Sequence, residues 1–453
     1  MSLVLALLGL GIAAILTIFN SSSDRIVRPT FLFSGVHALY IFPKILALSV
    51  SISPAARYFQ ASGTDVTVAY MALLCYLGFI LFYELLAPKP AYSYGNGYLK
   101  MPTKRTTNFA IIVGGSGFLA FLALIARNGG LYQYYFDLSF YQAELTGVNV
   151  WLIFLSRFTY PAIAAIALLA ALRPSRFSLS LLALLSMFPL MNVLFLFRRS
   201  DLLLLGFIAI YALTASGRIR LNRVFVLVGM GVMFLSISLF PYLRQDNIYK
   251  MTSRSHSAEV LSVQERLADS LEVDVDDEIV RAASTIDNAY KSGHYGLGTF
   301  IWDSLVNQFV PATLVGQDTK NSLYLGNSST SGDGGGYFDE QAFFYVAPMG
   351  FAQAYEQFGP LGWTIFSALG ALIALIERKS SKLSNLVFVI IAIPIVCLAA
   401  TNDIGSTPAR LVTFWILTRF LGKARWRTYR NRNVRKTIES RIKITPIVVG
   451  KRY

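Results

Sequence analysis

The chain has 453 residues, of which 55% are hydrophobic and only 14% are charged, and its formal net charge is +15. A soluble protein of this length carries about a quarter charged residues, so the composition excludes an ordinary soluble fold. The mean hydropathy of +0.53 agrees. Apolar residues also come in runs of about twenty, the length a helix needs to cross a bilayer. We therefore predict an all-α polytopic membrane protein.

The apolar runs predict about eleven transmembrane helices. The first run lacks the basic start and small-residue cleavage site of a secretory signal, so we expect it to remain as a helix. These spans place helices in 1–243 and 358–422, an extracytoplasmic loop subdomain at 244–357 and a basic cytoplasmic tail at 423–453. The predicted spans are 2–20, 29–50, 66–87, 107–127, 150–172, 178–197, 202–216, 224–243, 358–377, 384–401 and 411–422.

Basic residues alternate between the loops. They gather in the first, third, fifth, seventh and ninth loops, and the tail from Lys423 holds eleven Lys or Arg against one acid. The positive-inside rule then places the N-terminus outside and the C-terminus in the cytoplasm. A basic tail directly after a membrane helix is expected to contact anionic membrane lipids rather than nucleic acid.

The long loop at 244–357 has its own helical patterns. Ser257–Leu271, Ile279–Lys291 and Gly298–Val310 have apolar residues at helical spacing. Asp339–Gln357 is apolar and aromatic, and we expect it to lie on or dip into the membrane surface rather than span it. The loop is therefore predicted to form a small extracytoplasmic subdomain.

Five arginines lie at or near the predicted outer face, where cations should be rare. Arg157 lies seven residues inside the fifth span, where a charged side chain is costly and marks a functional site by default. Snorkelling to the outer headgroups is the alternative interpretation. Like charges repel, so convergence of the five requires an anion, and the planar fork of arginine suits pyrophosphate. The other four arginines are Arg198, Arg199, Arg244 and Arg410.

Acidic residues near these arginines allow two interpretations. Asp201, Asp246 or Asp403 could each pair with a nearby arginine and leave no anion site. Alternatively, an acid could accept the proton of a sugar hydroxyl during glycosyl transfer. The candidate bases are Asp403, Glu356 and His294, and the residues alone do not select one of them. No Gly-rich phosphate loop and no cluster with metal-ligand spacing occurs, so no cofactor or metal is expected.

At these residues the chain resembles the oligosaccharide repeat-unit (Wzy-type O-antigen) polymerases of the bacterial cell envelope. The matching patterns are Arg127-Asn-Gly-Gly130 before a Tyr-rich loop, Arg157-Phe-Thr-Tyr-Pro161, Arg198-Arg199-Ser-Asp before a run of Leu, Leu243-Arg244, Gly359-Pro-Leu-Gly362 and Arg410. The patterns are short, but they occur in order over most of the chain.

The resemblance implies a fold related to the lipid-dependent membrane glycosyltransferases, in the bacterial inner membrane. It implies transfer of a growing glycan from polyprenyl pyrophosphate to an incoming lipid-linked repeat unit, with the outer-face arginines stabilising the leaving pyrophosphate. A chain-length regulator protein is a further implied partner. The alternatives are an O-antigen ligase, for which His294 would be relevant, and a lipid-linked oligosaccharide flippase or transporter.

Overall fold

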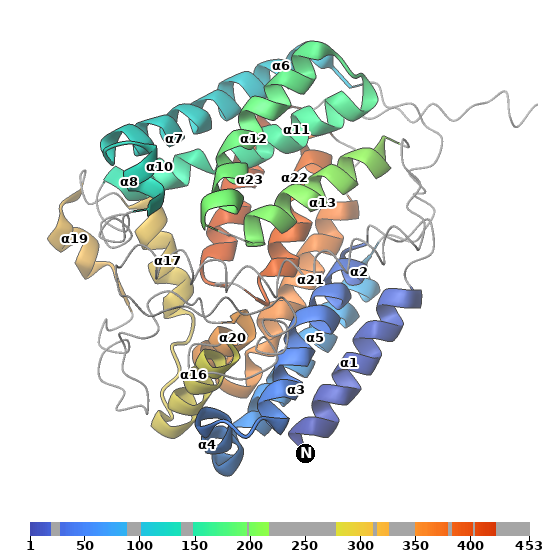
Figure 1. Ribbon diagram of the computed structural model, residues 1–453, viewed down its shortest axis with the longest axis vertical. Coiled ribbons are helices and arrows are strands. Elements are labelled where there is room, and N and C mark those ends of the chain that lie inside the picture. Colours follow the sequence, from blue (N-terminus) through green and yellow to red (C-terminus); the bar gives the residue numbers. More distant parts are fainter. Residues whose placement is uncertain are drawn as a thin grey trace, which may run out of the picture.

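The computed structural model describes residues 1–19, 28–87, 101–136, 148–196, 199–216, 278–310, 315–325, 349–378, 383–401 and 404–422. All regular structure within these ranges is helical (Figure 1). The helices are α1 (Ser2–Phe19), α2 (Pro29–Val36), α3 (Phe42–Val50), α4 (Pro54–Ser62), α5 (Thr64–Leu86), α6 (Thr103–Phe109), α7 (Gly115–Arg127), α8 (Leu131–Phe136), α10 (Val148–Ser156), α11 (Thr159–Leu172), α12 (Arg176–Leu196), α13 (Arg199–Ala215), α16 (Glu278–Ser292), α17 (Thr299–Phe309), α19 (Gln317–Ser322), α20 (Gly350–Phe358), α21 (Trp363–Arg378), α22 (Leu383–Leu398) and α23 (Ser406–Arg419). The π-helical turns His37–Ile41 and Ala110–Gly114 join α2 to α3 and α6 to α7.

Five helices among the described residues are long and apolar enough to cross a membrane, or six if the bent pair α20–α21 counts as one span. The five are Pro29–Val50, Thr64–Leu86, Thr103–Arg127, Val148–Leu172 and Arg176–Phe195. Helices lie at ten of the eleven predicted spans, whereas span 224–243 falls outside the described residues. The chain is therefore helical and suited to a membrane, while the count of eleven crossings stays a prediction.

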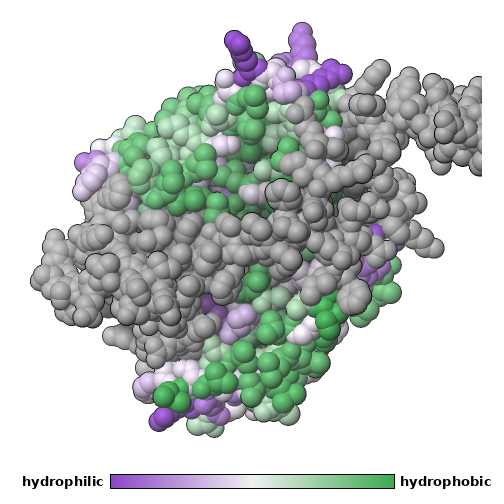
Figure 2. All heavy atoms as spheres, turned by 45° about the vertical axis from the view of Figure 1, so that its right-hand side comes forward, coloured by the Kyte–Doolittle hydropathy of each residue, from purple (hydrophilic) through white to green (hydrophobic). Residues whose placement is uncertain are grey.

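The outer surface of these helices is apolar over broad areas. Figure 2 shows hydrophobic residues over the upper and lower parts of the molecule, with hydrophilic residues gathered at the top and bottom ends. Large side chains such as Leu81 and Leu119 are 56% and 66% exposed. Soluble monomers rarely expose contiguous apolar patches of this kind, so this surface fits contact with lipid.

Helix α22 forms the centre of the helical array. Each of its residues is buried, and it packs against α2, α11, α13, α21 and α23. A helix that is apolar on all sides is stable only when other protein or lipid covers it completely. Cys397 of α22 and Cys75 of α5 are both buried free thiols that pack as small core side chains.

The chain turns sharply between α20 and α21, whose axes differ by 110°. Gly359 adopts a φ of +58°, a conformation that residues with a Cβ rarely adopt. A Cβ on Gly362 would lie 2.2 Å from the carbonyl oxygen of Ala354, so only glycine permits this return of the chain onto α20. The Gly359-Pro-Leu-Gly362 pattern is therefore a tight bend, and the predicted start of the ninth span at 358 is wrong: its helix begins at Trp363.

Two predicted helices of the long loop are found. α16 covers the predicted Ile279–Lys291, and α17, at Thr299–Phe309, lies within the predicted Gly298–Val310. The third, Ser257–Leu271, and the predicted start of the loop at 244 lie outside the described residues. Of the predicted surface segment Asp339–Gln357, the described part from 349 onward forms α20, and most of it is buried in the protein rather than exposed at a surface. The last span also starts earlier than predicted, at Ser406 rather than 411.

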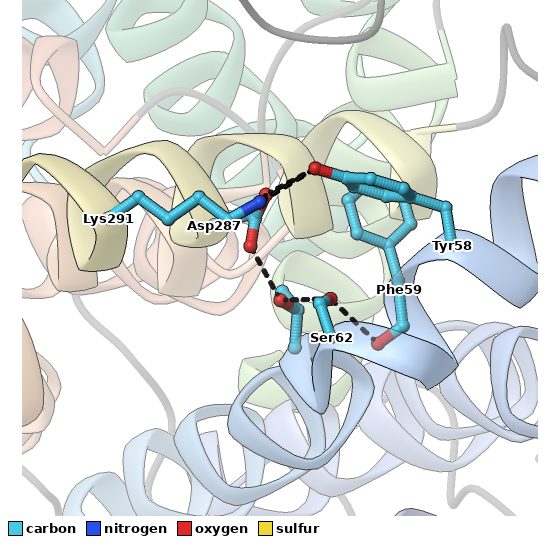
Figure 3. A network of polar contacts seen from close by, with 6 residues as sticks. Tyr58, Phe59, Ser62, Asp287 and Lys291 are labelled. Atoms are coloured by element: carbon cyan, nitrogen blue, oxygen red, sulfur yellow. Dashed lines mark hydrogen bonds and ion pairs between the residues drawn. The ribbon is translucent and has the colours of Figure 1, made fainter.

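A polar network attaches α16 to α4 and the start of α5 (Figure 3). Asp287 is buried and accepts a hydrogen bond of 2.8 Å from the hydroxyl of Thr64. The ammonium of Lys291 lies 2.6 Å from Asp287 and 2.7 Å from the hydroxyl of Tyr58. α16 also buries its apolar face. This helix of the predicted loop 244–357 is therefore attached to the helices of the apolar spans.

Candidate functional site

The fifth predicted span is broken at Arg157. α10 ends at Ser156, two non-helical residues follow, and α11 begins at Thr159. The cause is Pro161, because a proline lacks the N–H that would bond to the carbonyl four residues earlier, which is that of Arg157. That carbonyl instead accepts a hydrogen bond of 3.1 Å from the backbone N–H of Tyr160. Arg157 therefore lies at a local break in the helical hydrogen bonding, inside the segment Val148–Leu172, which remains one candidate span as the sequence pattern predicted.

Local side chains stabilise this break. The hydroxyl of Ser156 donates to the carbonyl of Ile153 at 2.7 Å, and the hydroxyl of Thr159 donates to the carbonyl of Ser156 at 2.8 Å. Both hydroxyl residues are fully buried. Such bonds satisfy carbonyls that a continuous helix would satisfy with its own backbone. The break is thus a defined conformation with its polar groups paired.

Helix α7 approaches the break closely at Gly117. A Cβ at this position would lie 2.8 Å from the backbone nitrogen of Thr159 and 3.1 Å from the carbonyl oxygen of Leu155. Both distances are shorter than ordinary contacts, which are about 3.5–4.0 Å. The small size of Gly117 therefore lets α7 support the backbone on both sides of Arg157.

The start of α13 is held beside the break by hydrogen bonds. Asp201 accepts one of 2.6 Å from the hydroxyl of Tyr160 and one of 3.0 Å from the amide of Asn192. Asn192 in turn accepts a hydrogen bond of 3.2 Å from the hydroxyl of Tyr135. This network joins α8, α11, α12 and α13. It brings the first turn of α13, which begins at Arg199, next to the turn that contains Arg157.

Helix α17 joins the break to α23. Its Phe309 ring lies 5.8 Å from the ring of Phe154 on α10, and its Phe300 and Ser304 lie against Gly405 at the start of α23. Arg410 is half-buried on α23, one turn inside the helix, whereas the predicted span began just after it, at 411. α10, which ends just before Arg157, and α23, which carries Arg410, therefore both contact α17, and α11 also touches α23.

Helix α20 fixes the segments on either side of this arrangement. The buried amide of Gln353 accepts a hydrogen bond of 2.8 Å from the backbone N–H of Ile404, just before α23. The buried amide of Gln357 accepts bonds of 3.1 and 3.2 Å from Gly298 and Phe300 at the start of α17. The sequence pattern did not single out these glutamines. Their spacing of four residues places both on one face of α20, which could have indicated a shared polar role.

The candidate base Glu356 lies at the end of α20, near Arg281 of α16. Burial raises the pKa of the Glu356 carboxyl above its usual range, while the positive charge of Arg281 acts to lower it. A raised pKa favours a carboxylate that accepts a proton near neutral pH. His294 is exposed in the loop before α17, and Gly296 of the same loop donates a hydrogen bond of 3.1 Å to the carbonyl of Glu356.

The structure thus places the predicted residues in two groups. Arg157, Arg410 and the start of α13 lie on helices that meet around α17 and α11. Glu356 and His294 lie at the first turn of α17, roughly 15 Å of helix away from Phe309 at its other end. The other candidates, Arg198, Arg244, Asp403 and the side chain of Arg199, lie outside the described residues.

Comparison of the chain with protein-family models, with curated proteins and with solved structures finds no match in any of the three.

Proposed function

We propose that the chain is a membrane glycosyltransferase that polymerises lipid-linked oligosaccharide repeat units at the outer leaflet of the bacterial inner membrane. The proposal rests on the helix break at Arg157 and on the position of Arg410. Arg410 lies on α23, which packs against α17 and α11, and these two helices also adjoin the break. An arginine within a membrane-crossing helix is costly unless it serves a ligand or a partner.

A break within a spanning helix adds to the positive field of Arg157. α11 starts at the break, and the N-terminus of a helix carries a partial positive charge. A guanidinium and a helix start in the same turn therefore favour a pyrophosphate group over a neutral sugar as the ligand of this region.

The proposed reaction is an inverting or retaining glycosyl transfer whose leaving group is polyprenyl pyrophosphate. A sugar hydroxyl of the incoming lipid-linked repeat attacks the anomeric carbon of the growing glycan, and the bond from that carbon to the pyrophosphate oxygen breaks. The hydroxyl proton passes to a base, with Asp403, Glu356 and His294 as the candidates. Arg157 and Arg410, together with Arg198, Arg199 and Arg244, are proposed to bind the pyrophosphate and stabilise its developing charge.

The decisive test is the length distribution of glycans in an envelope preparation from cells that depend on this chain. The variants are Arg157→Gln and Arg410→Gln, and Arg57→Gln on the exposed face of α4 is the matched control. Loss of a group that stabilises transition-state charge lowers rates by roughly 10²–10³-fold. We expect both site variants to lose long chains, while the control keeps them.

Three outcomes would count against the proposal. Unchanged long chains in Arg157→Gln would remove its central residue. Loss of single-repeat capping together with long chains would favour ligation or flipping instead, because a polymerase defect leaves single repeats available. Loss of wild-type activity on removal of divalent metal with a chelator would also contradict metal-free charge stabilisation by arginine.

A further inference from the structure

A second candidate site lies at the N-terminal end of the α6–α7 helix. A cavity of about 690 Å³ opens between the start of α6 and the end of α23. It is lined by Pro102, Thr103, Lys104, Arg105, Asn108, Phe109, Ile112, Val113 and Phe420. The helix break packs against Gly117, near the middle of the Thr103–Arg127 helix and about 20 Å along it from Thr103.

The lining of this cavity is divided into a polar rim and an apolar wall. Lys104, Arg105 and Asn108 are exposed on the first two turns of α6. Ile112, one turn further along, is 70% exposed, and Phe420 opposite is 67% exposed. Exposed apolar side chains next to cations match the boundary between the headgroups and the acyl chains of a bilayer.

The guanidinium of the exposed Arg105 lies close to the backbone of Gly422, just after α23. Gly422 has a φ of +70°, and a Cβ there would lie 1.9 Å from the guanidinium of Arg105. The absence of a side chain at Gly422 therefore gives the guanidinium its place. Neither Lys104 nor Arg105 forms an ion pair with another residue of the described ranges.

The described helices around the cavity, α6–α7, α11 and α23, carry basic side chains but no acidic ones. The sequence stretches 101–136, 159–178 and 406–422 contain no Asp or Glu. Arg173 reaches the same end of the molecule, with its Nη1 3.5 Å from the hydroxyl of Thr103. Figure 2 shows hydrophilic residues gathered at the top of the molecule, where α6 begins in Figure 1. An unbalanced cluster of cations favours an anionic ligand.

We propose that this cavity binds the headgroup of an anionic phospholipid from the predicted inner leaflet. The phosphate lies among Lys104, Arg105 and Asn108, and an acyl chain follows Ile112 and Phe420. Arginine and lysine donate charge-assisted hydrogen bonds to phosphate oxygens. Basic pockets between membrane helices on the cytoplasmic side bind such headgroups in other proteins. The apolar wall distinguishes a lipid from a free phosphate ion, which would gain nothing from it.

The test uses the full chain in nanodiscs of equal phosphatidylglycerol and phosphatidylcholine, followed by native mass spectrometry of the lipids that remain bound after detergent extraction. We expect the wild-type protein to retain phosphatidylglycerol in excess. The double variant Lys104→Gln/Arg105→Gln is expected to lower this excess about tenfold, because each basic residue contributes substantially to anionic lipid binding. The matched control Arg57→Gln/Arg378→Gln removes the same charge from exposed positions elsewhere and is expected to retain the excess.

A second variant and an added ion distinguish the sources of phosphate. Phe420→Ala removes part of the apolar wall without changing the charge, and we expect it to reduce lipid retention several-fold. Added inorganic phosphate, in excess, should leave the bound lipid in place. Displacement by inorganic phosphate, or an unchanged excess in both the double variant and Phe420→Ala, would overturn the proposal. Because this experiment measures bound lipid, its outcome does not depend on whether the chain transfers glycans.

Discussion

The close approach of α7 to the helix break gives a sharp prediction for Gly117→Ala. The added Cβ would lie 2.8 Å from the nitrogen of Thr159 and 3.1 Å from the oxygen of Leu155. Restoring ordinary contacts requires a shift of roughly 0.5–1 Å. Overpacking of this kind costs about 1–3 kcal/mol, and the better helix propensity of alanine offsets about 1 kcal/mol. The net loss of stability is therefore small, about 0–2 kcal/mol.

The functional effect is expected to be larger than the loss of stability. A displacement of about 1 Å at a reacting group can lower a rate roughly 10²-fold. If the break positions Arg157 for pyrophosphate, Gly117→Ala should lose long glycans while the purified protein keeps most of its thermal stability. The measurement is glycan length in envelope preparations beside thermal unfolding in detergent.

Gly115→Ala is the matched control, because it lies on the same helix and its Cβ would meet no atom within 4 Å. This variant should keep long glycans and gain up to about 1 kcal/mol from helix propensity. Equal glycan lengths in Gly117→Ala and Gly115→Ala would refute the reasoning that the close approach positions the break.

Three further substitutions test the packing and the polar networks. Gly370→Ala should lower the melting temperature by several degrees, because its Cβ would lie 2.5 Å from a carbonyl oxygen of α5. Tyr160→Phe removes a 2.6 Å hydrogen bond to Asp201; we expect a loss of about 1–2 kcal/mol in thermal unfolding and shorter glycans. The hydrogen bond of Lys291 to Asp287 raises the pKa of its ammonium above the usual 10.5. Lys291→Met should therefore unfold at a lower temperature than wild type near neutral pH, and this gap should close as the pH rises above 10.5.

Each of these three substitutions has a control variant or an outcome that would contradict the prediction. A Cβ at Gly35 would meet no atom within 4 Å, so Gly35→Ala should leave the melting temperature unchanged or raise it. Tyr70 is 47% exposed, and Tyr70→Phe should keep long glycans. If Tyr160→Phe and Tyr70→Phe shortened the glycans equally, the Asp201 network would have no specific role. A constant gap for Lys291→Met across the pH range would show that packing of its side chain, rather than its charge, stabilises α16.

The sequence by itself determined the helical class and the positions of most helices. Hydropathy runs of about twenty residues follow from the thickness of a bilayer, and they are a local property of the chain. α5, predicted at 66–87 and found at Thr64–Leu86, illustrates how closely such runs follow the helix. The amphipathic period of α16 was equally visible, because one face must be apolar to pack.

Local rules could also have located features that the hydropathy pattern concealed. Pro161 lies four residues after Arg157, and this spacing alone predicts the loss of a helical hydrogen bond at the arginine. The glycines of Gly359-Pro-Leu-Gly362 permit a sharp turn, but the 110° angle depends on the contact of Gly362 with Ala354. A run of apolar residues does not report such bends, because the hydropathy of a broken helix equals that of a straight one.

Only the tertiary structure decided which residues meet. Asp201 and Tyr160 are separated by 41 positions in the chain, and Gln353 and Ile404 by 51. Such contacts depend on how whole helices pack, and no periodicity within one helix encodes the neighbour on its other side. The positions of the arginines therefore predicted an anion site only from their charge and from the energetic cost of burying a charge in a membrane. The arrangement of α7, α11, α13, α17 and α23 decided that Arg157 lies at a supported break, with Glu356 and His294 at the other end of α17.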